Sequence, residues 1–476
     1  MVRRTVLAMF AVIATAFAIL SVMTLPRLAS AITPSTTAVT SITVGANPFG
    51  VAVSPDGSSV WVTNVTGTGT VTRIDTATNA VTSIAVGSGP YAVAASPDGS
   101  SVWVTNSGGS TVSRINTTTN NVTSINVGSN PNGVAVSPDG SSVWVTNYGT
   151  GSGTTVSRIN TATNAVTSIT VGSGPIGVAV SPDGSSVWVT NYGAGSGTTV
   201  SRINTATNVV IPITVGSVPR YVAVSPDGSS VWVTNYGDNT VSRINTATNN
   251  VSVPIIVGSG PADVAVSPDG SSVWVTSYGG TTVSHIDTTT NAVTSINVGS
   301  SPYNIAVSPD GSSVWVTNSG GSTVSRINTT TNNVTSINVG SSPYNIAVSP
   351  DGSSVWVANW GSGTVSRIIF PSQPPDNFTA TPGNAQATIS WTAPTNTGGS
   401  PITGYTATAS VGGPSCTTTT ATSCTISGLT NGTTYYVSVT ATNAVGISDP
   451  SVVAVTPTTP TTTTPTADLV TPAFTG

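Results

Sequence analysis

The segment Ser137-Pro-Asp-Gly-Ser-Ser-Val-Trp-Val-Thr-Asn147 decides the fold of this chain. Its first four residues form a β-turn sequence, because proline fixes φ at the second turn position and glycine accepts positive φ at the fourth. The run after the turn alternates tryptophan with valine, which is typical of a strand covered on both faces. The segment therefore predicts a hairpin whose second strand is buried.

The same turn recurs along the chain of 476 residues at intervals of 41–44 residues. Eight copies begin at Ser54, Ser96, Ser137, Ser181, Ser225, Ser267, Ser308 and Ser349. Each unit contains four short strands: an inner apolar run, the Trp strand, a Thr-Val-Ser-Arg-Ile-Asn strand and a last strand that ends in Val-Gly. Four strands in about 42 residues is the period of a β-propeller blade. We therefore predict an all-β fold with an eight-bladed β-propeller over residues 36–370; seven blades with one displaced unit is the alternative.

The two ends of the repeat region complement each other. The eighth unit stops at Phe370 without a fourth strand, whereas residues 38–44, Ala-Val-Thr-Ser-Ile-Thr-Val, precede the first unit. This heptapeptide is identical to residues 165–171, which form a fourth strand in the pattern. The N-terminal strand is thus expected to complete the last blade, which would close the ring and remove exposed sheet edges.

The composition excludes several classes of function. The chain has 11 Arg and 15 Asp but no Lys and no Glu, one histidine (His285), and a net charge of -4. This balance gives no basic patch for nucleic acid. A single histidine and the absence of Glu also argue against a metal site, a cofactor and paired Glu chemistry. We expect a protein that is not an enzyme and that has no catalytic residues.

The N-terminal segment predicts export. Arg3 and Arg4 precede an uncharged stretch, and Leu28-Ala-Ser-Ala31 ends in the small-x-small pattern of a cleavage site. We interpret residues 1–31 as a signal peptide, so the protein is expected to be secreted or at the extracellular cell surface, with no membrane span after cleavage. An uncleaved N-terminal membrane anchor is the alternative.

The repeat resembles a known family. The Ser-Val-Trp-Val-Thr-Asn strand, the Ser-Pro-Asp-Gly turn before it and the Gly-x-x-Pro-x-x-Val-Ala-Val run are similar to the YVTN-type β-propeller repeat, with Trp in place of Tyr. That resemblance implies a bacterial or archaeal surface or secreted protein more than it implies an activity. Streptogramin lyases are propellers of related build, and they do chemistry with His, Glu and a metal.

A second pattern follows residue 370. Pro-rich residues 371–377 predict a linker, residues 374–457 a β-sandwich, and Thr/Pro-rich residues 458–476 a tail. The run from Leu429 to Tyr435, Leu-Thr-Asn-Gly-Thr-Thr-Tyr, resembles the tyrosine corner of a fibronectin type III domain. Cys416 and Cys424 are the only cysteines, so we predict one disulfide that closes a small hairpin.

Variation among the repeats distinguishes the two rims of the ring. The Ser-Pro-Asp-Gly turn and the Thr-x-Thr-Asn turn barely change, and strand alternation places both on one rim, the invariant rim. The loops that join units and the loops after the Trp strand differ from unit to unit and lie on the other, variable rim. Variable surface loops often carry function, so the variable rim is the candidate binding face.

Aromatic rings and three charges mark the variable rim. Flat rings with Asn and Ser between them suit glycans or extended peptides. The candidate ligand-binding residues are Arg220, Tyr221, Tyr236, Asp238, Asp263, Tyr303, Tyr344 and Trp360. Two alternatives remain open here: the rings could simply plug the mouth of the ring, and Arg220 could form a loop bridge with Asp263.

The remaining charges repeat with the blades. Seven units carry an Arg in the third strand, His285 holds the eighth of these positions, and each turn carries an Asp. We expect these Asp and Arg residues to pair as ionic bridges or to cap turns, with His285 as an Arg substitute.

The leading functional hypothesis is a monomeric, secreted or cell-surface binding and scaffold protein. Its variable rim would bind a cell-wall polymer, a glycan or an extracellular protein, and the fibronectin-type domain would be a spacer or accessory module. One alternative is a polysaccharide-active or lyase-like propeller enzyme, for which Asp238 and Asp263 are the only carboxylate pair to try. The other is a purely structural cell-envelope protein.

Overall fold

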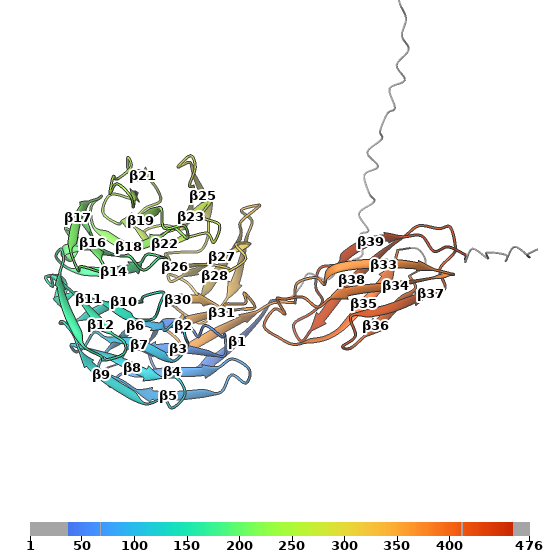
Figure 1. The fold of residues 1–476 in the computed structure, drawn as a ribbon, viewed down its shortest axis with the longest axis horizontal. Coiled ribbons are helices and arrows are strands. Elements are labelled where there is room, and N and C mark those ends of the chain that lie inside the picture. Colours follow the sequence, from blue (N-terminus) through green and yellow to red (C-terminus); the bar gives the residue numbers. More distant parts are fainter. Residues whose placement is uncertain (1–36, 67, 411–412, 460–476) are drawn as a thin grey trace, which may run out of the picture. The chain divides into compact units, whose positions relative to one another are not determined.

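The computed structural model describes residues 37–66, 68–410 and 413–459 (Figure 1). Over these ranges the chain is almost entirely β, with eight four-stranded antiparallel sheets followed by two further sheets. The prediction of an eight-bladed propeller is confirmed, and the seven-bladed alternative is wrong. The predicted signal peptide and nearly all of the predicted tail lie outside the described residues.

Each blade begins with an inner strand next to the channel and continues outward. Figure 1 shows the inner strands around the middle of the ring and strands such as β5 and β9 at its edge. The inner strands are β2 (Pro48–Val53), β6 (Pro90–Ala95), β10 (Pro131–Val136), β14 (Pro175–Val180), β18 (Pro219–Val224), β22 (Pro261–Val266), β26 (Pro302–Val307) and β30 (Pro343–Val348). The Trp strands are β3 (Ser59–Asn64), β7 (Ser101–Asn106), β11 (Ser142–Asn147), β15 (Ser186–Asn191), β19 (Ser230–Asn235), β23 (Ser272–Ser277), β27 (Ser313–Asn318) and β31 (Ser354–Asn359).

The outer half of each blade holds the third and fourth strands. The third strands are β4 (Thr70–Asp75), β8 (Thr111–Asn116), β12 (Thr155–Asn160), β16 (Thr199–Asn204), β20 (Thr240–Asn245), β24 (Thr282–Asp287), β28 (Thr323–Asn328) and β32 (Thr364–Ile369). The fourth strands are β5 (Val81–Ala85), β9 (Val122–Asn126), β13 (Val166–Thr170), β17 (Val210–Thr214), β21 (Ile255–Ile256), β25 (Val293–Asn297) and β29 (Val334–Asn338). Two 3-10 turns, η1 (Gly149–Gly151) and η2 (Gly193–Gly195), lie in loops after Trp strands.

The first strand of the chain closes the ring. Strand β1 (Ala38–Thr43) pairs antiparallel with β32, from Ala38 opposite Ile369 to Thr43 opposite Thr364. It thereby completes the sheet that also contains β30 and β31. Strand β30 of this last blade also contacts β2 of the first. The prediction of closure by the N-terminal strand is confirmed.

The core of the propeller is divided among the junctions between blades. Trp103 of blade 2 is fully buried against Val143, Val145 and Ile159 of blade 3. At the closing junction Trp356 packs in the same way against blade 1. The neighbouring sheets cover both faces of the Trp strand, so its tryptophan and its valines are all buried.

Every inner strand contains a β-bulge near its start. In blade 1, Pro48 pairs with Asn64 and Val51 with Val62, so two residues of β2 oppose the single residue Thr63. The equivalent shift occurs in the other seven blades. Tyr221 lies within this bulge and belongs to the inner strand β18, not to the loop that joins the units. An added residue re-aims side chains at this point.

Residues 376–455 form a fibronectin type III sandwich, as expected. One sheet contains β33 (Asp376–Gly383), β34 (Gln386–Thr392) and β37 (Ser423–Ser427). The other contains β36 (Ser415–Thr418), β35 (Ile402–Ala409), β38 (Tyr435–Asn443) and β39 (Ser451–Val455). The tyrosine corner is present, because the Thr430 N–H donates to Tyr435 Oη at 3.0 Å.

The predicted disulfide between Cys416 and Cys424 is confirmed. Its expected position in a hairpin is wrong, because β36 and β37 belong to different sheets and the bond links the two layers. Among the described residues, no helix is long and apolar enough to cross a membrane.

Candidate functional site: the mouth of the ring

The bulge places two consecutive residues of each inner strand at one end of the channel. We call this end the mouth and define it by the second and third residues of the eight inner strands. The second residues are Phe49, Tyr91, Asn132, Ile176, Arg220, Ala262, Tyr303 and Tyr344. The third residues are Gly50, Ala92, Gly133, Gly177, Tyr221, Asp263, Asn304 and Asn345. Small third residues therefore line blades 1–4, and larger polar ones line blades 5–8.

A cavity of about 190 Å³ lies on the side with the small residues. Phe49, Tyr91 and Tyr221 contribute to its wall together with Gly133 and Gly177. A Cβ on Gly133 would lie 2.4 Å from the Ile176 carbonyl oxygen, so this position excludes larger side chains. The mouth is thus open on one side and filled on the other.

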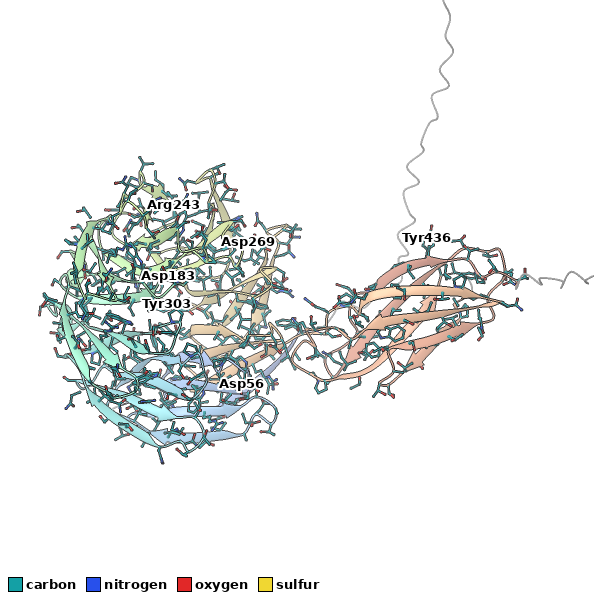
Figure 2. All side chains as sticks on the ribbon, in the orientation of Figure 1. Asp56, Asp183, Arg243, Asp269, Tyr303 and Tyr436 are labelled. Atoms are coloured by element: carbon teal, nitrogen blue, oxygen red, sulfur yellow. A yellow bond between two sulfur atoms is a disulfide. The ribbon has the colours of Figure 1, made fainter. Side chains whose placement is uncertain are left out.

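Aromatic rings form a continuous arc that runs from blades 1 and 2 on the open side to blades 7 and 8 on the filled side. Phe49 stacks on Tyr91 at a centroid distance of 4.3 Å and lies 5.6 Å from Tyr344, which lies 5.0 Å from Tyr303. Trp360 lies 5.8 Å from the Tyr344 ring. Phe49 and Tyr303 are only 7% and 6% exposed, and Figure 2 labels Tyr303 near the middle of the ring. These two rings pack the mouth, whereas Tyr344 and Trp360 are half-buried and present surface.

Arg220 lies among four tyrosine rings. Its Cζ is 5.4 Å from the ring centroids of Tyr236 and Tyr303, and 5.9 Å from those of Tyr221 and Tyr278. Its Nη2 also donates a long hydrogen bond of 3.4 Å to Tyr303 Oη. Cations near ring faces are stabilised by the ring quadrupole, so this cage holds the guanidinium in place while its other donors stay available.

Asp263 is the third residue of β22 and is held by donors from its own and the next blade. Its Oδ1 accepts from the Val264 N–H at 2.8 Å, and its Oδ2 accepts from the Ile305 N–H at 3.2 Å and from the Asn304 side-chain amide. Burial raises the pKa of Asp263 to about 6, against the opposing effect of these donors and of the Arg220 charge. This carboxyl group therefore changes charge close to neutral pH.

The structure brings most of the predicted ligand residues together. Arg220 contacts Tyr221, Tyr236 and Tyr303, and its charge acts on Asp263. Asp238 is different, because it is exposed and its carboxylate accepts a hydrogen bond from the Ser217 N–H in a joining loop.

Several residues that contribute to the mouth were missing from the predicted set, including Phe49 and Tyr91 in the wall of the cavity. Tyr278 joins the cage around Arg220, and Asn304 holds Asp263 and accepts from the Ile346 N–H at 3.0 Å. Asn345 lines the cavity. The signal for the two asparagines was present, since units 7 and 8 have Asn where units 1, 3 and 4 have Gly.

Tyr91 and Tyr221 remain neutral in the mouth. Burial raises the pKa of each phenol above its usual value. Both can therefore donate a hydrogen bond to a ligand at physiological pH.

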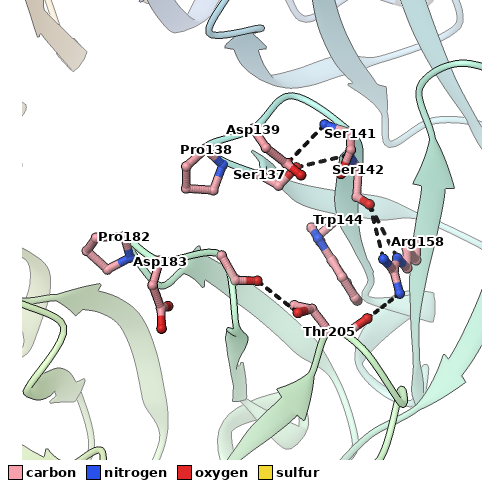
Figure 3. Close-up of a pocket in the computed structure, with 11 residues that line it drawn as sticks. Ser137, Pro138, Asp139, Ser141, Ser142, Trp144, Arg158, Pro182, Asp183 and Thr205 are labelled. Carbon is pink, nitrogen blue, oxygen red and sulfur yellow. Dashed lines mark hydrogen bonds between the residues drawn. The ribbon is translucent and has the colours of Figure 1, made fainter.

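The constant charges of the invariant rim form structural contacts. Asp139 caps its own turn by accepting from Ser137 Oγ at 2.6 Å and from the Ser141 N–H at 3.0 Å. Arg158 instead lies 5.0 Å from the Trp144 ring and donates to the next blade, at Thr205 O (Figure 3). The expectation of turn caps is borne out by these bonds. The expected ionic pairing is not observed among the described residues, where six of the seven third-strand arginines instead donate to the next blade.

His285 takes the arginine position in blade 6. Its ring stacks on Trp274 with centroids 4.1 Å apart and planes 2° apart. Burial lowers its pKa. His285 lies in the third strand β24, beside Ser272 at the invariant rim, so it does not contribute to the mouth.

The donor set of the mouth does not fit the metal chemistry implied by the resemblance to streptogramin lyases. Asp263 already accepts three hydrogen bonds, and neither histidine nor glutamate lies beside it. Over the described ranges, no cluster of three or more His, Cys, Asp or Glu side chains could hold a metal ion.

Comparisons with known proteins give the family of the propeller. Residues 77–368 match the Virginiamycin B lyase family, and residues 373–457 match the fibronectin type III domain. The comparisons do not show the YVTN-type label, whereas the expected order of propeller and fibronectin domain is confirmed. No curated protein matches the sequence.

Solved structures share the propeller fold. Hydrazine synthase of Kuenenia stuttgartiensis is 24% identical, with a TM-score of 0.51, covering 68% of this chain and 96% of that one. Virginiamycin B lyase from Staphylococcus aureus is 18% identical, with a TM-score of 0.50, covering 70% and 99%. A streptogramin B lyase is 16% identical, with a TM-score of 0.49, covering 70% and 98%.

The family match corrects the expectation that this chain is not an enzyme. A family named for a lyase covers most of the propeller, from residue 77 to residue 368. The expectation was wrong because it counted residue types. A low number of Glu and His residues does not exclude chemistry by the arginine, aspartate and tyrosines that the fold brings together in the mouth.

Proposed function

The chain belongs to the virginiamycin B lyase family, and we propose that it is an extracellular propeller that binds its ligand at the mouth. The observation that carries this proposal is the cage around Arg220. Four tyrosine rings fix the guanidinium, and the nearby Asp263 oxygens are already occupied by backbone and amide donors. The free donors of Arg220 are thus available to a carboxylate or carbonyl oxygen of a ligand.

The surroundings of Arg220 favour a flat, weakly polar ligand. The open side of the mouth offers a cavity lined by Phe49, Tyr91 and Tyr221, and Tyr344 and Trp360 present partly exposed rings beside it. Glycans, cell-wall polymers and peptides all combine flat faces with oxygen acceptors. An extracellular address is supported by the disulfide and by the signal-like N-terminal sequence.

A binding array tests this proposal. The full chain is applied to glycans, cell-wall polymers and peptides, together with the Arg220→Gln variant. Loss of one charge-assisted hydrogen bond should weaken binding by at least about tenfold. Asp238→Asn is the matched control, because Asp238 lies on the same rim but is hydrogen-bonded to Ser217. Equal binding by wild type and Arg220→Gln would refute the proposal, provided both melt at similar temperatures.

A lyase-type reaction at the mouth is a second candidate, favoured by the titration of Asp263 near neutral pH. A carboxylate with a pKa of about 6 is well suited as a general base. Asp263 would accept a proton from a carbon next to a carbonyl group. The electron pair of that C–H bond would form a C=C bond to the neighbouring carbon, which bears the leaving group. The bond to the leaving group would break with both electrons, and Arg220 would stabilise the negative charge on the carbonyl oxygen.

Virginiamycin B is the first compound to test, since the family carries its name. Its conversion without addition of water is followed by mass spectrometry for wild type, Asp263→Asn and Asp238→Asn. Activity should rise with pH as Asp263 ionises around pH 6, and Asp263→Asn should lower the rate by at least about a hundredfold. Turnover by Asp263→Asn at the wild-type rate would eliminate Asp263 as the base, while leaving binding at Arg220 to be judged by the array.

A further inference from the structure

The invariant rim contains a bridge that repeats from blade to blade. In blade 3, Arg158 packs on Trp144, its Nε lies 3.3 Å from Ser142 Oγ, and its Nη1 donates to blade 4 (Figure 3). The acceptors in blade 4 are Thr205 O at 2.6 Å and Asn208 Oδ1 at 3.0 Å. One guanidinium thus satisfies a carbonyl and an amide oxygen of the next turn.

The same two acceptors are occupied at five other junctions. There the Nη1 donor is separated by 2.6–2.8 Å from a threonine carbonyl and by 2.8–3.3 Å from an asparagine Oδ1. The donors are Arg73, Arg114, Arg202, Arg243 and Arg367.

The junction between blades 6 and 7 lacks this guanidinium because the sequence has His285. The imidazole stacks on Trp274, and its Nε2 lies 2.9 Å from Ser272 Oγ, so it replaces the inner part of the arginine. Nothing in the described chain replaces Nη1. Asn332 Oδ1 is buried without a hydrogen-bond partner, although Asn332 has the same left-handed backbone (φ 57°) as its counterparts.

A cavity of about 250 Å³ lies at this junction. Its wall includes Trp274, Thr329 and the carboxylates of Asp269 and Asp310. Hydrogen bonds from Ser267 and its neighbours hold the pKa of Asp269 below its usual value, so that carboxylate is charged at neutral pH. The equivalent cavity between blades 3 and 4 measures about 210 Å³ and contains Arg158 in its wall. The pocket at blades 6 and 7 therefore combines room and negative charge, and Thr329 in its wall belongs to the same turn as Asn332, whose Oδ1 has no partner.

We propose that this pocket, the blade 6–7 slot, binds a guanidinium group supplied by a small guanidino compound or by an arginine side chain of a partner. One nitrogen of a guanidinium can donate to Asn332 Oδ1 and to Thr329 O at once, as arginine Nη1 does at the six complete junctions. The planar fork leaves a second nitrogen for the Asp269 or Asp310 carboxylate in the wall of the slot, and an ammonium ion has no second nitrogen. His285 does not repel the ligand, because burial keeps its ring neutral at physiological pH.

Thermal unfolding of the full chain in methylguanidinium chloride tests the slot. At about 10 mM the ligand should raise the melting temperature by on the order of 1 °C relative to equal methylammonium chloride. His285→Arg fills the slot with its own guanidinium and should abolish the shift. Arg243→His creates a second slot between blades 5 and 6, and should enlarge the shift. A wild-type shift equal to that of His285→Arg, or no shift, would overturn the proposal.

Two further arms identify the source of the group and keep the test independent of variant folding. Agmatine and an Arg-containing tripeptide are compared in the wild type; stronger stabilisation by agmatine indicates a small compound, and by the tripeptide a partner side chain. A crystal of the wild type soaked in methylguanidinium should show the planar ion on Asn332 Oδ1. Water alone at that position would contradict binding.

Discussion

Asp263 is a buried carboxyl group whose pKa is raised, whereas the pKa values of turn aspartates such as Asp139 are lowered. Its folded pKa of about 6 lies above the value of 3.8 expected for an unfolded chain. A raised pKa stabilises the fold through the protonated form, so this contribution is complete below about pH 3.8 and is lost as pH rises through 6. Near neutral pH the folded protein therefore holds the less favourable ionised carboxylate in the mouth.

The first prediction concerns Asp263→Asn. The variant does not titrate, so it should gain stability relative to wild type as pH rises from 4.5 to 7.5, by about 1–3 kcal/mol. Urea unfolding at both pH values measures this difference. Asp238→Asn, which removes an exposed carboxylate of the same rim, is measured at both pH values as the control substitution. A difference between wild type and Asp263→Asn that does not vary with pH would contradict the prediction.

The contacts of the turn aspartates and third-strand arginines could be predicted from the sequence only in part. The pattern placed each turn aspartate and each third-strand arginine on one rim, and this placement holds for Asp139 and Arg158. It also suggested that the two would pair. In the structure Arg158 reaches Thr205 of the next blade, because neighbouring sheets are rotated relative to each other. No spacing within one repeat records that rotation.

The bulge of the inner strand is hydrogen-bonded to the next blade through a threonine side chain. Thr146 Oγ1 accepts from the Gly133 N–H at 2.8 Å and donates to Ile176 O of blade 4 at 2.8 Å. Blade 8 has Ala358 at this position, fully buried, so the closing junction lacks both bonds. The bulge itself could not be predicted, because the Pro-x-x-Val sequence fits a regular strand equally well.

The second prediction compares Thr146→Ala with Ala358→Thr. Removing the hydroxyl leaves a buried donor and a buried acceptor unpaired, which should lower the free energy of unfolding by about 1–3 kcal/mol. Adding it at Ala358 should raise that free energy by about 0.5–1.5 kcal/mol, since Asn345 N and Phe49 O occupy the positions of the partners in the other blades. Chemical unfolding of both variants provides the measurement, and changes of the same sign in the two would speak against a role for this contact.

Over the whole molecule, the eight turn aspartates act together. Hydrogen bonds from serines hold their pKa values low, at about 2 for Asp139 and Asp227. A lowered pKa gives stability that is present above the unfolded value of 3.8 and is lost as pH falls toward the folded value. Because every blade contains one such turn, all eight blades lose this stabilisation over the same range of pH.

The third prediction is acid unfolding of the propeller between about pH 4 and 2. Circular dichroism during acid titration should show this transition. Asp139→Asn should make the remaining transition less dependent on pH, because one of the titrating groups is absent. A propeller that keeps its full stability at pH 2 would show that the turn carboxylates contribute little.

The number of blades and the closure of the ring could be predicted because both follow from repeats along the sequence. The spacing of the Ser-Pro-Asp-Gly turns counts the blades, and residues 38–44 repeat a fourth-strand sequence that the last unit lacks. The mouth could be predicted only in part. Arg220 and Asp263 stood out as charges in variable segments, but the cage around Arg220 requires side chains from blades 5, 6 and 7 to meet, which depends on ring closure.

The last prediction concerns that closure. Ile42 of β1 and Ile84 of β5 occupy equivalent fourth-strand positions and are almost equally buried, at 7% and 6% exposed. Substituting either with Ser should cost about 2–5 kcal/mol through lost burial and a cavity. Strand β5 is connected to a further strand at both ends, whereas β1 is the first strand of the described residues and within them is connected to one strand, β2. Ile42→Ser should therefore release β1 locally, and hydrogen exchange should accelerate in β1 and in its partner β32 before global unfolding. Ile84→Ser should show no such local opening of β5 and β4, and equal exchange patterns in the two variants would mean that β1 is held by more than its pairing with β32.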